Sequence, residues 1–433
     1  MNDQSPIPND LDSFWMPFTA SRTFKKAPKL VNKAKGLFYS TPEGREILDG
    51  TGGLWCSNAG HGHPRIVEAI QKQAAEMDFA HSFNQSHPIA FQTASRMVAL
   101  APGFDHVFFT NSGSEAVDTA LKIALAYHTH RGEGQRRILV GRQKAYHGIN
   151  FGGLSVGGIG LNKGQFGTLY PNALHMRHTL LPENRFSRGQ PEDGAHLAED
   201  LAGICETHGG HNIAAVIVEP VAGAGGVFPP PKGYLQRLRE ICDEHGILMI
   251  FDEVITGFGR MGTPFASQYF DVTPDIFTAA KGMSNATVPM GGVFTTSKVR
   301  EAFLSGPEAM PDLFHGYTYS GHPLACAAAL ATLDVYRDEG IFENAAEMMP
   351  VWEDMLHSLK DGRDVVDIRN MGILGAIEFD PKSERTAAQV AQAAWDKGLG
   401  IRPIGNSVAM SPPLTIDRPH IEMVQSILKE VIG

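Results

Sequence analysis

The apolar residues in the middle of the chain form short uninterrupted runs, and small, polar or acidic residues follow each run. The runs are Val107–Thr110, Ile138–Val140, Asn212–Pro220, Ile247–Asp252 and Ile276–Ala280. Runs of this length without alternation are typical of strands buried on both faces of a parallel sheet. Segments with helical periodicity, such as Lys232–His245, lie between them. From about residue 104 to residue 296 the pattern therefore predicts an α/β fold with an open, mostly parallel sheet.

The hydrophobic pattern changes beyond about residue 340. It predicts a smaller α+β domain with two strands within Val365–Phe379, a helix at Ala387–Lys397, a strand at Gly400–Pro403 and a helix at Pro419–Ile432. Near the start of the chain, Lys35–Asp49 has the pattern of a β-hairpin, and we expect it to pack beside this domain. The predicted organisation is an N-terminal arm and part of the small domain over residues 1–55, a large cofactor-binding domain over residues 56–335 and a C-terminal small domain over residues 336–433.

Further helices are expected at Pro64–Met77, Ala195–Glu206 and His322–Tyr336. Phe151–Gly167 is rich in glycine and has no periodic pattern, which predicts a mobile loop near the binding crevice.

The first residues predict no regular structure. Residues 1–12 are polar and are expected to form a loosely docked tail. Phe14–Phe18 is too apolar to remain in water, which predicts an arm that covers the core or a subunit interface.

Composition and charge exclude several classes of function. Of 433 residues, 42% are hydrophobic and 19% are charged, as in ordinary globular proteins. A net charge of −10 without lysine- or arginine-rich runs argues against nucleic acid or an anionic membrane as a partner. No apolar stretch approaches the ~20 residues of a membrane span, and the polar start has no secretory signal pattern. The four cysteines lie far apart without CxxC spacing, so we expect no disulfide and no zinc site, and a cytoplasmic location.

Polar residues follow the predicted strands at their carboxyl ends. Asp252 and Glu219 each end an apolar run, Tyr146 and His147 follow another, and Lys281 comes directly after Ile276–Ala280. Because the carboxyl ends of parallel strands meet in one crevice where ligands bind, we expect these side chains to face a common ligand. An aspartate presented there can hold a pyridinium nitrogen, and a lysine can form a Schiff base.

The sequence Asn111-Ser112-Gly113-Ser114 separates a predicted strand from a predicted helix. Small residues at a helix N-terminus expose backbone N–H groups and the positive end of the helix dipole, which suits a phosphate. The same serines are good N-caps, with Glu115 favourable in the first turn, so the motif alone fits both roles. The other strand-end residues favour phosphate, because all of them together fit pyridoxal phosphate: Asp252 for the ring nitrogen, an aromatic residue to stack on the ring, and Lys281 as nucleophile.

Other catalytic motifs are absent or lack their structural context. Gly257–Gly262 matches the GxGxxG pattern of dinucleotide-binding sites, but Pro264 follows at once and no amphipathic helix opens on the third glycine. The chain has no GxxxxGK[ST], GxSxG or HExxH sequence. A P-loop nucleotide site, a serine hydrolase and a catalytic metal are therefore not predicted.

Several longer motifs are more specific than any single residue. They are TNSGSEAVDTALKIA, AYHG, VEPVAGAGGVFPPPKGY, IFDEVITGFGRMG, AAKGMSN and HGYTYSGHPLACAAAL. Together they resemble the class III aminotransferases, which have the type I pyridoxal-phosphate transferase fold, and the likeness runs from about residue 14 to the C-terminus. WMPFTA and VVDIRNMGILGAI are most similar to the β-alanine–pyruvate (ω-amino acid–pyruvate) branch of this family.

The resemblance implies how each matching residue would contact the cofactor. Lys281 would form the Schiff base with pyridoxal phosphate and move the substrate proton, and Asp252 would hold the pyridine nitrogen. Tyr146 and Val254 would pack on opposite faces of the ring. The remaining cofactor-binding residues would be Ser112, Gly113 and Ser114 at the phosphate, Glu219 and His147 near the ring, and Thr318 reaching the phosphate from a second subunit. The implied assembly is a homodimer with shared sites, alone or paired into a tetramer.

The resemblance also implies the substrate contacts. Trp55 would line the substrate pocket, and Arg402 would bind the carboxylate of a keto acid and swing away for apolar amines, since its planar two-pronged donor suits a carboxylate. Relatives that use ornithine or 4-aminobutyrate carry a glutamate where this chain has Ala224, so Arg402 is expected to lack that partner. This favours the pyruvate-using branch. Ala409 offers no side-chain hydrogen bond to a substrate, which leaves the amine donor open.

The implied reaction is ping-pong transfer of an amino group from an ω-amino acid or amine, such as β-alanine, to pyruvate, giving alanine and an aldehyde or ketone. Aminotransferases that prefer taurine, diamines or 2-oxoglutarate remain alternatives. So do decarboxylases, racemases and aminomutases of the same fold. A nicotinamide dehydrogenase built on Gly257–Gly262 and a non-catalytic binding protein are more distant alternatives.

Overall fold

A seven-stranded sheet forms the centre of the molecule, for which a computed structural model describes residues 11–167 and 169–433. Its strand order is β4-β10-β9-β8-β7-β5-β6. The strands are β4 (His106–Thr110), β5 (Ile138–Arg142), β6 (Ala173–Met176), β7 (Ile213–Val218), β8 (Leu248–Asp252), β9 (Ile276–Ala279) and β10 (Gly291–Thr295). β10 is antiparallel to both of its neighbours, and the other adjacent strands are parallel. The predicted α/β fold with a mostly parallel sheet is confirmed.

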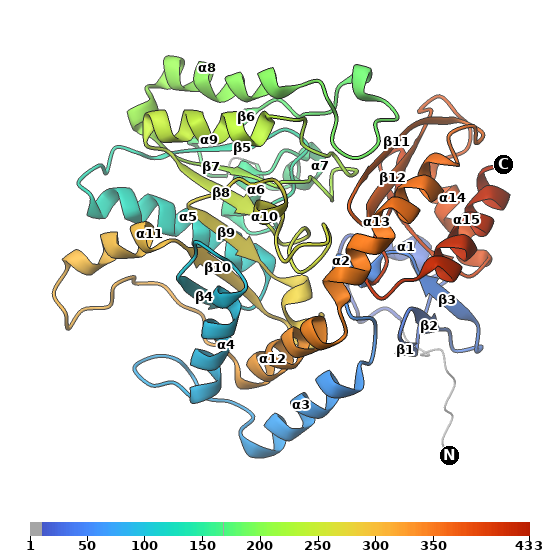
Figure 1. The fold of residues 1–433 in the computed structure, drawn as a ribbon, viewed down its shortest axis with the longest axis horizontal. Coiled ribbons are helices and arrows are strands. Elements are labelled where there is room, and N and C mark those ends of the chain that lie inside the picture. Colours follow the sequence, from blue (N-terminus) through green and yellow to red (C-terminus); the bar gives the residue numbers. More distant parts are fainter. Residues whose placement is uncertain (1–10, 168) are drawn as a thin grey trace.

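Helices cover both faces of this sheet, which explains why its central strands are apolar throughout. Alternate residues of a strand point to opposite faces. Ala215 and Ile217 of β7 pack in one cluster with α5 (Gly113–His130), whereas Val216 and Val218 pack in another with α9 (Tyr234–His245). Every residue of β7 is buried as a result. α8 (Glu199–His208) lies beside α9 on the same side of the sheet (Figure 1).

Two smaller sheets lie beside the large one, and one of them joins the C-terminal part of the chain to its beginning (Figure 1). One is antiparallel and has the order β11 (Val365–Met371), β12 (Leu374–Phe379), β15 (Ser407–Met410), β14 (Arg402–Ile404). The other has the order β1 (Lys33–Lys35), β2 (Phe38–Ser40), β3 (Glu46–Asp49), β13 (Leu399–Gly400). In the second sheet, Leu48 pairs with Leu399 in parallel register, so the N-terminal hairpin lies beside the C-terminal residues. The exact domain boundaries stay a prediction.

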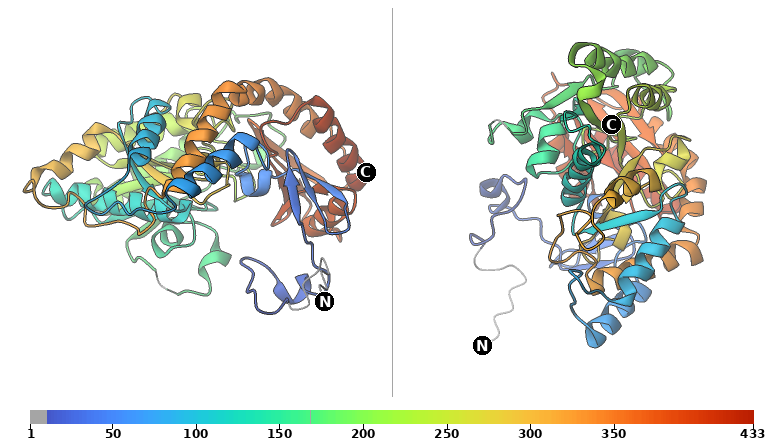
Figure 2. Two further views of the ribbon diagram at one scale, coloured as in Figure 1. Left: turned by 90° about the horizontal axis from the view of Figure 1, so that it is seen from below. Right: turned by 90° about the vertical axis from the view of Figure 1, so that its left-hand side faces the viewer.

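The helices predicted from periodicity are confirmed, but α4 (Pro88–Ala99) and α13 (Ile341–His357) were not predicted. Around the small sheets lie α13, α14 (Ala387–Asp396) and α15 (Arg418–Ile432). α12 (Pro323–Asp338) packs against α3 (Pro64–Glu76) and α4, and the views from two sides show this helical layer at the edge of the large sheet (Figure 2).

The prediction of an irregular loop over Phe151–Gly167 was wrong in part. This segment contains α6 (Phe151–Val156) and α7 (Gly160–Lys163). Tertiary contacts override the low helix propensity of its glycines: Asp118 Oδ1 accepts from the Gly153 backbone N–H at 2.8 Å. A Cβ at Gly153 would lie 2.1 Å from the His147 carbonyl oxygen, so only glycine allows this close packing.

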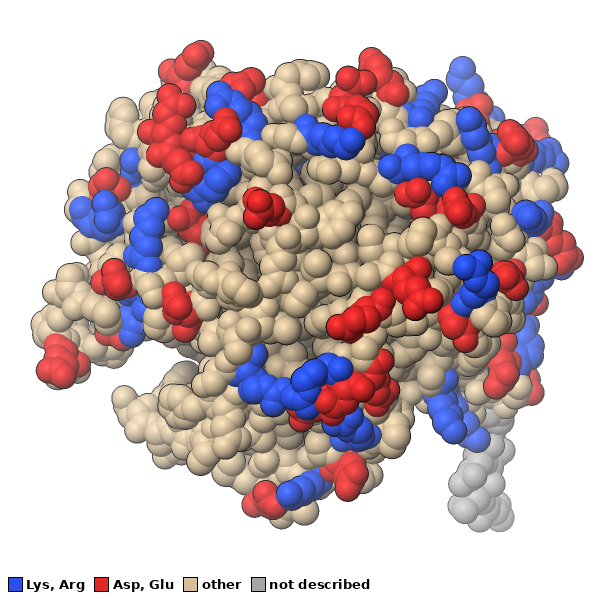
Figure 3. Space-filling model, viewed as in Figure 1, with Lys and Arg blue, Asp and Glu red and all other residues tan. Residues whose placement is uncertain are grey.

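The apolar arm does not cover the core of its own chain. Phe14, Trp15 and Phe18 are 66%, 92% and 71% exposed. Coverage of a subunit interface therefore stays a prediction, and the tail predicted for residues 1–12 lies largely outside the described residues. Positive and negative side chains are interspersed on the face shown in Figure 3. Across the described ranges, no helix has the length and apolar character needed to cross a membrane.

Candidate active site

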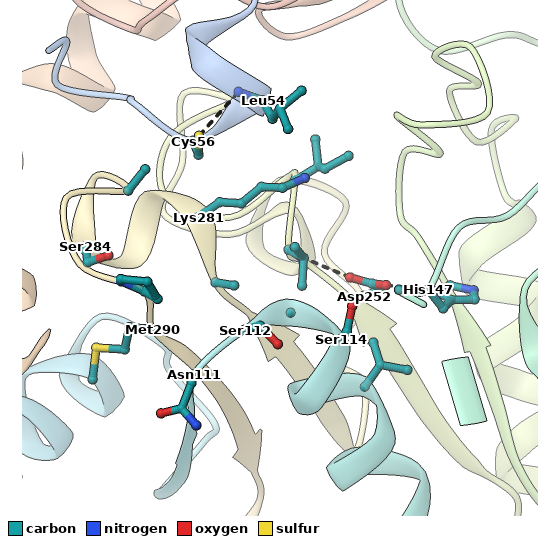
Figure 4. Close-up of a pocket in the computed structure, with 18 of the residues that line it drawn as sticks. Leu54, Cys56, Asn111, Ser112, Ser114, His147, Asp252, Lys281, Ser284 and Met290 are labelled. Carbon is teal, nitrogen blue, oxygen red and sulfur yellow. Dashed lines mark hydrogen bonds and ion pairs between the residues drawn. The ribbon is translucent and has the colours of Figure 1, made fainter. Parts of the chain in front are cut away.

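A cavity of about 350 Å³ lies at the carboxyl ends of the parallel strands (Figure 4). Asn111 follows β4, Tyr146 follows β5, Glu219 follows β7, Asp252 ends β8 and Lys281 follows β9, and all five line this cavity. The expectation that the strand-end residues share one crevice is therefore met. Sequence reasoning missed other lining residues: Leu54, Cys56, Val288 and Met290, which lie outside the quoted motifs, and Ile255 and Ser284, which lie inside them but were given no role.

Lys281 stands in the cavity on a strained backbone. Its φ of 48° lies in the left-handed region, where the short helical turn Lys281–Ser284 begins. Tyr336 Oη donates to the carbonyl of the next residue, Gly282, at 2.7 Å and fixes this turn. Removal from water lowers the pKa of Lys281 to about 8, although Cys56, Asp252 and Glu219 favour its charged form. Near neutral pH a substantial fraction of this amine is a nucleophile.

Asp252 is a buried carboxylate held from three sides. Its Oδ2 lies 2.8 Å from His147 Nδ1, and its Oδ1 accepts from the Val254 N–H at 3.1 Å and from Thr278 Oγ1 at 3.4 Å. These bonds fix the direction of the carboxylate, and His147 is completely screened from solvent behind it. Such an arrangement can present a fixed negative charge to a cationic ring nitrogen.

Glu219 is a second buried carboxyl group beside the first. Its Oε1 accepts from the Tyr146 N–H at 2.9 Å and its Oε2 from the Gly223 N–H at 3.2 Å. Burial raises the pKa of Glu219 to about 7; His147 opposes this rise and Asp252 adds to it. Glu219 therefore changes protonation near neutral pH and can hold a proton beside a ligand oxygen.

The N-terminus of α5 forms the opposite wall of the cavity. Ser112 is the N-cap, because its side chain accepts from the Glu115 N–H at 3.1 Å, and the capping role considered for this motif is real. The amides of Gly113 and Ser114 belong to the first turn, which has no intrahelical acceptors for them, and both residues line the cavity. A Cβ at Gly113 would lie 2.9 Å from Val254 Cγ1, so glycine is needed for this close approach.

These groups fit pyridoxal phosphate. One cavity brings together an amine with a lowered pKa for the aldehyde, an anchored carboxylate for the pyridinium and a helix N-terminus for the phosphate. Within the described ranges, no group of three or more histidine, cysteine, aspartate or glutamate side chains could hold a metal ion.

The Trp55 ring lies close to both Lys281 and Arg402. Lys281 Nζ is 5.3 Å and Arg402 Cζ is 5.6 Å from the centroid of that ring. Trp55 has a φ of 59° and follows Gly52 and Gly53, which also have positive φ values, so a strained turn delivers the indole to this place. Arg402 is half-buried on β14; burial lowers its pKa, and Tyr146 counteracts the effect. Its guanidinium has no ion pair with any described carboxylate.

Three residues of the expected site, Trp55, Arg402 and Thr318, do not line this cavity, and neither does Ala224. Thr318 is exposed, and its expected contact with the phosphate from a second subunit stays a prediction. Ala224 is partly buried against the core and places no side-chain charge near Arg402.

The lowered pKa of Lys281 predicts a pH-dependent stability difference. Below pH 8 the Lys281 amine is charged in both the folded and the unfolded cofactor-free protein. Removing this charge from water then lowers the free energy of unfolding. Between pH 8 and 10.5 only the unfolded chain keeps the proton, so the free energy of unfolding rises with pH. We expect Lys281→Met to stabilise the cofactor-free protein at pH 7 by about 2 kcal/mol, since the cavity admits water and reduces the full effect.

Urea unfolding of the cofactor-free proteins measures this difference, which should vanish as the pH approaches 10.5. Lys429→Met, at an exposed position of α15, is the matched control and should show no such trend. Equal stability of the Lys281→Met protein and the parent chain at pH 7 would contradict the burial of a charged amine.

Comparison with known proteins agrees with this geometry. The family profile of class III aminotransferases matches residues 19–432. The chain is 56% identical over 430 residues to an ω-aminotransferase of Caulobacter vibrioides, covering 98% of both proteins. It is 43% identical to a β-alanine–pyruvate aminotransferase of Pseudomonas aeruginosa, covering all of this chain and 98% of that one.

Solved structures show the same fold. An amine transaminase from an uncultivated Pseudomonas species, with bound pyridoxal phosphate, superposes with a TM-score of 0.90 at 34% identity and covers 98% of this chain and 99% of that one. An (S)-enantioselective ω-transaminase of Thermomicrobium roseum gives a TM-score of 0.90 at 34% identity, with 97% and 96% of the two chains covered. The chain therefore belongs to the class III aminotransferase family and is a pyridoxal-phosphate-dependent aminotransferase of type I fold.

Proposed function

We propose that this aminotransferase moves the amino group of an ω-amino acid or primary amine, such as β-alanine, to pyruvate in a ping-pong reaction. The products are an aldehyde or ketone and alanine. The observation that carries the proposal is the position of Arg402: its guanidinium lies over Trp55, the same ring that contacts Lys281, and no described carboxylate pairs with it. The relatives of this chain that are named ω-aminotransferase and β-alanine–pyruvate aminotransferase support the same substrate classes.

Arg402 suits a small keto acid. A half-buried guanidinium without an ion-pair partner attracts an anion strongly, because burial has already removed part of its hydration. Since Ala224 offers no competing carboxylate, the cation is available whenever a carboxylate enters. For an apolar amine, the long arginine side chain can leave room by moving its guanidinium from the Trp55 ring towards solvent.

The cavity residues divide the chemistry among themselves. Bound pyridoxal phosphate supplies an aldehyde and an electron sink. Lys281, with its pKa of about 8, would supply the neutral amine and would move a proton to and from the substrate carbon. Asp252, oriented by His147, would hold the positive charge of the ring nitrogen, and the first turn of α5 would bind the phosphate. Glu219 would hold a proton beside a ligand oxygen.

We further propose that two copies of the chain form shared sites. Thr318 lies in an exposed segment together with two exposed aromatic residues, Phe314 and Tyr319, whose exposed fractions are 78% and 56%. Aromatic residues exposed to this degree are typical of interfaces rather than of free surface. A second copy packed here would cover them and bring its Thr318 to the phosphate site.

Arg402→Ala tests the assignment of the keto acid site. We expect the KM for pyruvate to rise about 10- to 100-fold, because the variant loses one charged hydrogen-bonded contact to the carboxylate. The rate at which 1-phenylethylamine bleaches the yellow protein should change little, because that amine has no carboxylate. Absorbance spectroscopy follows this half-reaction, and coupled alanine formation gives the KM.

A panel of donors and acceptors completes this experiment. β-Alanine, taurine, putrescine and 1-phenylethylamine are each paired with pyruvate and 2-oxoglutarate. Arg363→Ala removes an exposed arginine from the same part of the chain and is the matched control. The proposal is wrong if Arg402→Ala leaves the KM for pyruvate unchanged. It is also wrong if the parent protein accepts only 2-oxoglutarate.

Shared sites predict complementation between two inactive proteins. Lys281→Ala removes the nucleophile, and Thr318→Asp places a negative charge against the phosphate. In a mixed dimer, one site combines the intact Lys281 of one copy with the intact Thr318 of the other. Co-expression should therefore restore about a quarter of the parent activity, because half of the dimers are mixed and each has one good site. Two proteins that stay inactive together, while forming mixed dimers by mass spectrometry, would contradict shared sites.

A further inference from the structure

The motif Gly257–Gly262 forms a turn that carries an unusual buried cation. No helix follows its third glycine directly, as expected from Pro264. Its Arg260 has no exposed surface, and none of its hydrogen bonds to described residues goes to a carboxylate. Burying a guanidinium without a directly bonded carboxylate is costly, and Asp49 offsets only part of the burial that lowers the pKa of Arg260, so its position calls for a reason beyond packing.

Arg260 binds oxygens from two distant parts of the chain. Its Nη2 donates to Asn58 Oδ1 at 2.7 Å. Its Nη1 donates to Ser411 Oγ at 2.8 Å and to the carbonyls of Ser411 and Pro412 at 3.2 and 2.5 Å. Asn58 Nδ2 in turn donates to the Phe258 carbonyl at 2.7 Å, which closes a buried ring of bonds around the motif.

The Asn58 end of this network fixes the segment that carries Trp55. Asn58 packs so closely on the residue after Lys281 that a Cβ at Gly282 would lie 2.5 Å from its Nδ2. Asn285, in the same turn, accepts from the Ala59 N–H at 2.8 Å and donates to the Gly60 carbonyl at 2.8 Å. Trp55, three residues before Asn58, is thereby set at its distance from Lys281.

The Ser411 end fixes the strand beside Arg402. Ser411 directly follows β15, and within this sheet Ala409 of β15 pairs with Arg402 of β14. The Ser411 N–H also donates to the Gly50 carbonyl at 2.8 Å, and the Leu414 N–H donates to the Asn58 carbonyl at 2.7 Å. The Arg260 guanidinium, directly and through Asn58, thus links the turn that begins at Lys281, the segment that carries Trp55 and the strand that pairs with β14.

We propose that Arg260 is a positioning residue for substrate recognition, which holds Trp55 and Arg402 in register with Lys281. The inference rests on the proposed role of Arg402 as the carboxylate ligand. Arginine is required because its planar fork points several N–H donors in fixed directions, whereas a lysine amine cannot reach both ends of the network. A misplacement of about 1 Å in such a support is enough to cost up to 100-fold in a well-oriented reaction.

The test uses the holoenzyme and two readouts. Calorimetry measures the Kd of propionate, a carboxylate with no carbonyl to react, and steady-state kinetics separate KM from kcat for pyruvate. For Arg260→Lys we expect both the propionate Kd and the pyruvate KM to rise about tenfold or more, with a larger rise for Arg260→Met. Turnover of 1-phenylethylamine in the half-reaction should fall less than either change.

Arg136→Lys is the matched control. Arg136 is also buried and donates to three carbonyls, those of Gly210, Ile213 and His245, but at the amino ends of β5 and β7. Its loss should lower the Tm and leave propionate binding unchanged. If an Arg260 variant does not fold, Asn58→Ala replaces it, since this change removes one acceptor of the network and keeps the cation.

Two results decide the proposal. Arg260→Lys or Asn58→Ala proteins that resemble Arg136→Lys, with a lower Tm but a propionate Kd and a pyruvate KM within twofold of the parent, would overturn it. Arg402→Ala in the same assays separates this outcome from failure of the proposed function. If Arg402→Ala also binds propionate like the parent, the assignment of Arg402 as the carboxylate ligand is wrong. If Arg402→Ala no longer binds propionate, that assignment stands and only the proposed role of Arg260 is wrong.

Discussion

The site depends on keeping one lysine amine largely out of water while several carboxyl groups stand near it. Removal from water favours the neutral amine, and Asp252, Glu219 and Cys56 favour its charged form, so the balance brings the pKa of Lys281 to about 8. The surrounding structure maintains this balance. Parallel strands end at one edge of the sheet and deliver the carboxylates there, and a left-handed backbone at Lys281 directs the side chain into the cavity.

Two kinds of buried ionic group support this arrangement in different ways. Asp252 has a hydrogen-bonding partner for each of its oxygens, and Glu219 accepts from two backbone amides, so their directions are fixed locally. Arg260 instead bonds to residues far from it in sequence, and none of these hydrogen-bonding partners is a carboxylate. The first kind tunes charge at the cavity, and the second holds separate chain segments at fixed distances.

The sequence predicted the central sheet and the strand-end residues because both follow from local patterns. An apolar run that ends in Asp252 or Glu219 predicts a buried strand and the edge where its last residue lies. Residues whose roles depend on contacts across the fold left no such pattern. Cys56 and Asn58 lie in an irregular glycine-rich segment, and nothing near Arg260 in the sequence indicates that Ser411 will be its partner. The helix at Phe151–Val156 was missed for a related reason, since Asp118 and tight packing at Gly153 stabilise it from outside the segment.

The parallel pairing of Leu48 with Leu399 has a consequence for how the chain is made. A ribosome releases Trp55 and the hairpin before it several hundred residues earlier than the strand that completes their sheet. Contacts of such long sequence separation form late, because the entropy of closing the loop must be met first. The central sheet can therefore assemble during synthesis, while the sheet that contains the N-terminal hairpin waits for the last residues. A chain truncated before Leu399 would contain all seven strands of the central sheet and lack the strand that pairs with Leu48.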